Sequence, residues 1–104
     1  MLTIHDVMLG VIATMRPMVA AIERKDADLG RQLRRAAASV VLNVAEGSGS
    51  FGRVRVARYR TALGSARETL ACLRTAEAFG YVESVGPAGV GPMNRVIGTL
   101  VRVA

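Results

Sequence analysis

The chain has 104 residues, of which 51% are hydrophobic and 4% aromatic, with no tryptophan. A chain of this length forms one domain and buries roughly two-thirds of its unfolded surface around a single core. That core must be aliphatic, which favours helices, and the lone Cys72 excludes an internal disulfide. The net charge is +6, and every basic residue except Lys25 is arginine. This bias favours an anionic partner, because guanidinium groups match phosphate and carboxylate oxygens two at a time.

The first predicted helix spans about residues 3–24. Thr3 and Asp6 form a capping pattern at its start, and apolar residues then recur every three or four positions. Pro17 lies inside this pattern and must either kink the helix or split it. The longest charge-free run in this first segment, Val7–Met15, is too short to span a bilayer. We therefore expect a soluble, cytoplasmic protein without membrane contact.

The second predicted helix, about residues 29–47 with Asp28 as its cap, is apolar on most sides and should lie centrally or in a subunit contact. A single polar seam runs along it, formed by Arg35, Ser39, Asn43 and Glu46. We expect Asn43 and Glu46 to be buried and hydrogen-bonded, because an unpaired buried polar group is costly. The partner of Glu46 should come from another helix, because Arg35 lies two to three turns away.

The segment Gly47–Gly52 matches the pattern G-x-G-x-x-G of dinucleotide-binding proteins. That function requires a strand before the motif and further strands to form a parallel sheet. The helical period before Gly47 argues against a strand there, and no second strand-like run exists in the chain. We interpret the motif as a helix end, with Gly47 in the left-handed conformation, followed by a mobile loop.

The third predicted helix spans about residues 54–79 and ends at Gly80. Its apolar residues alternate by three and four, which is typical of helices packed in a bundle. Gly64 lies in mid-helix, where glycine is less favourable than alanine by about 1 kcal/mol. We expect this glycine to allow close approach of a neighbouring helix.

A loop rich in glycine and proline, Glu83–Gly91, should precede a fourth helix over about residues 92–103, with Pro92 in its first turn. The chain is therefore predicted to be a single all-α domain, residues 1–104, folded as an up-and-down four-helix bundle. Helices 1 and 2 have more apolar surface than one bundle can cover, so we expect the bundle to form a homo-oligomer.

Few residues are suited to catalysis. His5 is the only histidine, and Cys72 lies among apolar neighbours with no histidine nearby in sequence to activate it. The Glu-x-x-His pairs of di-iron bundles are absent from the sequence. We therefore expect no catalytic residues, no metal site, no cofactor and no enzymatic activity.

Arginines recur every seven residues along the third predicted helix, about 10.5 Å apart. We call these four residues the arginine stripe: Arg53, Arg60, Arg67 and Arg74. Arg55 and Arg58 widen the stripe, and Arg34 lies near the start of the second helix. The stripe is either a solvated face with some arginines in ion pairs or a phosphate-binding face. With so few aromatic residues, backbone-directed binding is expected over base-by-base reading.

Two blocks of residues carry a family resemblance. The first is Leu29, Gln32–Ala36, Ser39, Asn43 and Ala45–Gly47, and the second is Ala62–Ser65, Glu68 and Phe79–Val82. At this spacing the chain resembles a bacterial family of four-helix-bundle proteins. The family includes the proteins encoded in intervening sequences of large-subunit ribosomal RNA genes and the accessory variability determinant of diversity-generating retroelements. The chain departs from the family in having Val41 where a proline is frequent.

The resemblance implies a ring-like homo-oligomer, a pentamer in the family, with no catalysis. It also implies a basic surface that binds nucleic acid and, in the retroelement protein, a reverse transcriptase. From the residues and the resemblance together we expect a non-enzymatic, oligomeric accessory protein that binds DNA or RNA through its arginines. The alternative is a structural or protein-adaptor oligomer without nucleic-acid affinity.

Overall fold

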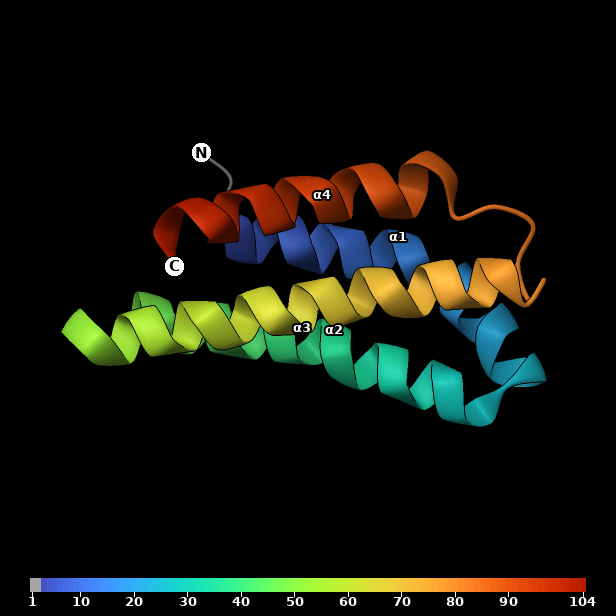
Figure 1. Cartoon of the computed structure of the whole chain (residues 1–104), viewed down its shortest axis with the longest axis horizontal. Coiled ribbons are helices and arrows are strands. Elements are labelled where there is room, and N and C mark those ends of the chain that lie inside the picture. The colour runs from blue at the N-terminus through green and yellow to red at the C-terminus, as the bar shows by residue number, and fades with distance from the viewer. Residues whose placement is uncertain (1–2) are drawn as a thin grey trace.

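The computed structural model describes residues 3–104, apart from the side chains of residues 87–89. Its four helices are α1 (Ile4–Lys25), α2 (Ala27–Ser48), α3 (Gly52–Ala78) and α4 (Gly86–Val103). Each helix contacts the next, and α4 contacts α1, so the four close into an up-and-down bundle (Figure 1). The described residues contain no strand. The predicted all-α four-helix bundle is confirmed.

The core is aliphatic, as the composition predicts. Its largest fully buried side chains come from all four helices and include Met8, Met15, Ile22, Leu33, Leu73, Met93 and Leu100. Cys72 is buried among them, and burial, with a smaller effect from Glu68, raises the pKa of its thiol. A raised pKa disfavours the reactive thiolate.

One end of the bundle is held together by Asp26. Its Oδ1 accepts a hydrogen bond from the Leu29 backbone N–H (3.0 Å) and so caps α2, while Oδ2 accepts one from the Tyr81 hydroxyl (3.1 Å). Burial and this hydrogen bond raise the pKa of Tyr81. The prediction that Asp28 caps this helix is wrong, since Asp26 is the cap and α2 begins two residues earlier than expected. Asp28 instead lies in the first turn, where a carboxylate interacts favourably with the positive end of the helix dipole.

The turn between α3 and α4 begins with Gly80, at φ +77°. The Gly80 N–H bonds to the Glu77 carbonyl (3.0 Å) and the Tyr81 N–H to the Ala76 carbonyl (2.9 Å), the pattern of a Schellman motif. The predicted start of the fourth helix at Pro92 is wrong, since α4 begins at Gly86. The side chain of Glu77 accepts a hydrogen bond from the Val85 N–H (2.8 Å), so a residue of α3 supports the earlier start.

Both internal prolines lie within continuous helices. Pro17 does not split α1, and Pro92 lies inside α4 rather than in its first turn. Each proline removes one backbone hydrogen bond. The packing of the surrounding apolar faces compensates for that loss. α1 buries side chains before and after Pro17, and α4 has the partly buried Val90 before Pro92 and the buried Met93 after it.

α2 and α3 approach each other closely at small residues. Gly47 is buried inside α2, and a Cβ at this position would lie 2.6 Å from Cε1 of Tyr59 on α3. Two turns earlier, the hydroxyls of Ser39 and Ser65 are 2.7 Å apart. The predicted left-handed conformation of Gly47 is therefore wrong, since α2 continues to Ser48. The expected role of Gly64 is also wrong, because a Cβ there would have no atom within 4 Å.

Replacing Gly47 with alanine tests this contact. We expect Gly47→Ala to lower the free energy of unfolding by about 1–3 kcal/mol, because the new methyl group must displace the buried Tyr59 ring. Gly64→Ala is the matched control and should raise stability by up to about 1 kcal/mol through helix propensity alone. Urea unfolding followed by circular dichroism measures both. Equal effects of the two substitutions would contradict the assigned contact.

Candidate nucleic-acid interface

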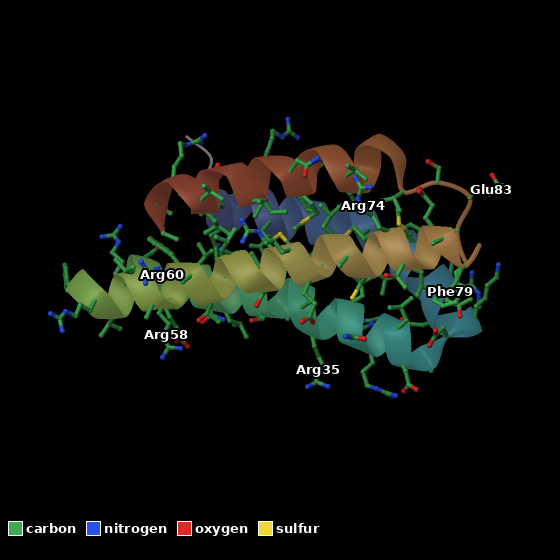
Figure 2. All side chains as sticks on the ribbon, in the orientation of Figure 1. Arg35, Arg58, Arg60, Arg74, Phe79 and Glu83 are labelled. Atoms are coloured by element: carbon green, nitrogen blue, oxygen red, sulfur yellow. The ribbon has the colours of Figure 1, made fainter. Side chains whose placement is uncertain are left out.

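The arginine stripe lies on α3, the longest helix, and all four of its side chains are exposed. Among residues 3–104, none of the four makes an ion pair. In the view of Figure 2, Arg74 projects on the side of α4, whereas Arg35 and Arg58 project from the opposite edge, along α2. The bundle therefore carries arginines on two sides of α3.

The other three predicted binding residues have partners within the chain. Arg34 donates two hydrogen bonds to Glu23 of α1 (2.9 and 2.8 Å), which lower the pKa of Glu23 and raise that of Arg34. Arg58 pairs with Glu46 of α2 at 2.9 Å. Arg55 lies over the ring of Tyr59, 5.6 Å from its centroid, a cation–π arrangement. These three guanidinium groups are less available to an external anion than those of the stripe.

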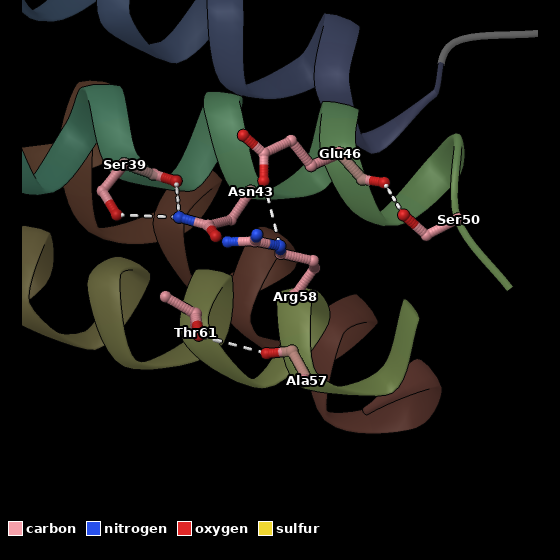
Figure 3. Close-up of polar contacts among 7 residues, drawn as sticks. All are labelled: Ser39, Asn43, Glu46, Ser50, Ala57, Arg58 and Thr61. Atoms are coloured by element: carbon pink, nitrogen blue, oxygen red, sulfur yellow. Dashed lines mark hydrogen bonds and ion pairs between the residues drawn. The ribbon is translucent and has the colours of Figure 1, made fainter. Parts of the chain in front are cut away.

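The polar seam of α2 faces the edge of α3. Asn43 is half-buried, and its Nδ2 donates to the Ser39 carbonyl (2.9 Å) and hydroxyl (3.1 Å), as Figure 3 shows. Ser39 in turn contacts Ser65, a partner that the sequence analysis did not identify. The predicted burial of Glu46 is wrong, since it is exposed, but its expected partner from another helix is found in Arg58. Arg35 is exposed at the other end of the seam.

A polar groove of about 590 Å³ lies beside this seam, between α2 and α3. Its lining includes Asp28, Arg31, Arg35, Ser39, Ser65 and Glu68. Arg31 and Asp28 form an exposed ion pair within α2, so charges of both signs line the groove. A surface of mixed sign suits a polar protein contact better than a polyanion.

α1 leaves much of its apolar surface uncovered. By length and composition alone this helix could cross a membrane, although the core helix of a soluble protein passes the same test. Of its most apolar 18-residue window, 22% is buried by the rest of the chain. Grooves of about 870 and 850 Å³ run along it, against α2 and α4 respectively. Arg16 borders the first groove and Arg95 the second.

The described part of the chain holds no cluster of three metal-ligating side chains. His5 is half-buried in the first turn of α1, where Thr3 and Asp6 form the predicted capping box. The hydrogen bonds from Thr3 lower the pKa of Asp6. Asp6 therefore has a helix-capping role.

A family model described as 23S rRNA-intervening sequence protein matches residues 12–86, from the middle of α1 to the start of α4. The chain belongs to this family. The match covers all of α2 and α3, which carry the seam and the stripe, and it confirms the family resemblance given by the sequence. The likeness to the retroelement determinant stays a prediction. No curated protein and no solved structure matches this chain.

The ion pair between Glu23 and Arg34 predicts a pH dependence of stability. The pKa of Glu23 in the folded protein lies below its ordinary value of 4.5. The pair therefore contributes its full stability above the ordinary pKa, and this contribution is lost as the pH falls through the lower pKa of the folded state. Arg34→Gln should therefore reduce stability near neutral pH, by a small amount because the pair is exposed, and have less effect in acid.

Urea unfolding of wild type and Arg34→Gln at several pH values measures the difference in stability between them. Arg16→Gln serves as the control, since Arg16 is exposed and makes no ion pair in the part of the chain that the structure describes. A stability difference for Arg34→Gln that is the same at neutral and acidic pH would contradict the assigned pair.

Proposed function

We propose that this chain is a non-catalytic, cytoplasmic accessory protein that binds nucleic acid through the arginine stripe. The observation that carries the proposal is the state of the four stripe arginines: all are exposed, and none is ion-paired within residues 3–104. The stripe extends about 31 Å along α3, close to the roughly 34 Å of one turn of B-form duplex. A phosphate backbone laid along α3 would meet one guanidinium group for every two turns of the α-helix.

Family membership supports a nucleic-acid-associated role. The family's name refers to 23S rRNA, and the match includes the whole of α3. Arginine is suited to phosphate because its planar fork donates two hydrogen bonds at once. Backbone-directed binding of this kind has little sequence preference and depends strongly on salt.

A second candidate, a protein adaptor, is favoured by the polar groove between α2 and α3. This groove combines arginine, carboxylate and hydroxyl groups, and Arg58 beyond it is already paired with Glu46. Such a surface fits the polar rim of a protein contact. The two candidates use different sides of α3, so substitutions on one side distinguish them.

We also propose that the bundle self-associates, with the pentamer implied by the family resemblance as the expected form. Ala38, Leu42 and Ala45 form an apolar line along α2, and all three are exposed, Leu42 by 61%. Ala38 also borders the apolar groove against α1. Soluble monomers rarely leave contiguous apolar surface uncovered, so a second copy is the natural partner for this face.

Nucleic-acid binding is tested by salt titration with mixed-sequence duplex DNA and structured RNA. We expect tight binding at about 50 mM salt and a loss of several orders of magnitude by about 200 mM, since each neutralised phosphate contributes about −0.9 to the log–log slope on duplex DNA. Arg60→Glu with Arg67→Glu should weaken binding at least tenfold and reduce the slope by about 2.

The matched control is Arg16→Glu with Arg95→Glu, which changes the net charge equally but at the two grooves of α1. It should affect binding much less than the stripe variant. Absence of wild-type binding at about 50 mM salt, or equal effects of the two double variants, would reject the stripe as the binding surface and favour the adaptor.

Light scattering tests self-association. We expect a mass several times the chain mass of 11.0 kDa, and a lower mass for Leu42→Asp because a carboxylate would be buried in the apolar contact. Val101→Asp, on α4, is the control, since Val101 is also an exposed apolar residue, at 52%. A wild-type mass of 11.0 kDa at micromolar concentration would contradict self-association.

A further inference from the structure

A shallow hollow of about 580 Å³ lies at the first turns of α3, outside the core. It is lined by Gly52, Arg53, Val56, Ala57 and Arg60. The two arginines are two helical turns apart, about 10.5 Å along the axis. Between them the lining is apolar, formed by two aliphatic side chains and a glycine without one. The hollow therefore combines an apolar floor with two cationic groups of the arginine stripe.

Phe51 adjoins this hollow through Gly52 and is the most exposed large hydrophobic side chain described, at 85%. It occupies the N-cap position of α3 but makes no side-chain capping bond. Gly52, at φ +58°, turns the chain sharply there, and the preceding Ser50 is tied back by its hydroxyl to the Glu46 carbonyl (2.7 Å). Phe51 is thus presented at the tip of the α2–α3 hairpin with its side chain almost fully exposed.

The surroundings of Phe51 are cationic. No acidic residue occurs from Gly47 to Arg67, and the preceding acid, Glu46, is neutralised by Arg58. In Figure 1 the hairpin extends past the C-terminal end of α4, so its tip is open to a large partner. An exposed aromatic ring beside unpartnered arginines is the combination with which proteins hold unpaired nucleotides, the base stacking on the ring and the phosphates meeting the cations.

We propose that Phe51 and the adjoining hollow form a subsite for one unpaired nucleotide of a bound nucleic acid. The base stacks on Phe51, the sugar lies over Val56 and Ala57, and Arg53 and Arg60 hold the flanking phosphates. This inference rests on the proposed function, and it adds a preference for unpaired nucleotides that the stripe alone lacks. A fully paired duplex hides its base faces, so it would bind the stripe without occupying the subsite.

A second copy of the chain is the competing occupant. The arginines disfavour the hairpin tip of a second copy as the occupant, because two such tips would bring like charges together. A polyanion with an accessible base satisfies both the apolar and the cationic parts of the subsite at once. The experiment therefore measures nucleic-acid binding and oligomer mass on the same variants.

The experiment compares two RNA hairpins that differ by one bulged nucleotide, 2-aminopurine, present in one and absent from the other. Binding is measured by fluorescence anisotropy, and stacking by the emission of 2-aminopurine. We expect wild type to prefer the bulged hairpin. Phe51→Ala should weaken binding of the bulged hairpin roughly tenfold, leave the paired hairpin within about twofold, and abolish the emission change.

Two variants sharpen the test. Phe51→Trp should retain the preference, because indole also stacks on bases. Phe79→Ala removes the other highly exposed phenylalanine, 68% exposed at the opposite end of the bundle, and should bind both hairpins as wild type does. The slope of log affinity against log salt should be the same for Phe51→Ala and wild type, because the phenyl ring contacts no phosphate.

The outcomes separate the subsite from the proposed function. If wild type binds neither hairpin, both are overturned. If wild type binds both hairpins equally and Phe51→Ala changes nothing, the subsite is rejected while binding along the stripe stands. If Phe51→Ala lowers the oligomer mass measured by light scattering, Phe51 is a contact between copies and the subsite is likewise rejected.

Discussion

The close approach of α2 and α3 is the constraint on which the rest of the structure depends. With so few aromatic side chains, the bundle fills its interior with aliphatic residues, and it brings these two helices together wherever small residues permit. Gly47 against Tyr59 and Ser39 against Ser65 define that contact. It supports the part of the hairpin that extends beyond α4, where the first arginines of α3 lie (Figure 1). The position of the candidate interface is therefore a consequence of helix packing.

The distribution of acidic residues explains why the stripe is left unpaired. Most carboxylates interact with groups outside the stripe: three pair with other arginines, and three accept hydrogen bonds from backbone N–H groups at helix ends. The first group is Glu23, Asp28 and Glu46, and the second is Asp6, Asp26 and Glu77. The net charge of +6 is therefore not spread evenly over the molecule. Positive charge is concentrated along the arginine stripe, whose four side chains have no ion-pair partner within residues 3–104.

Features set by neighbouring residues could be predicted from the sequence. The Thr3–Asp6 capping box, the end of α3 at Gly80 and the aliphatic core follow from local patterns, and all three are present. The roles of Gly47 and Gly64 could not be predicted, because they depend on which face of a helix meets its neighbour. Either glycine is small enough to allow a close contact between helices, but only Gly47 lies at such a contact in the structure.

The candidate site shows the same limit. The sequence identifies the spacing of the stripe arginines, but the ion pairs that occupy Arg34 and Arg58 join residues of different helices. The start of α4 depends similarly on Glu77, which belongs to α3. Phe51 is one of only four aromatic residues, and its neighbours in sequence do not indicate that its side chain is exposed. Its exposure and the adjoining hollow depend on the fold of the hairpin tip.

The two ends of the bundle differ in how freely they can change during evolution. At one end Asp26 joins the α1–α2 corner to Tyr81 of the α3–α4 turn, so a substitution there disturbs both connections at once. At the other end the connection between α2 and α3 is three residues long, from Gly49 to Phe51. Exposed loop tips tolerate substitution and insertion. Related bundles can therefore vary the residues at their hairpin tips while keeping the same fold.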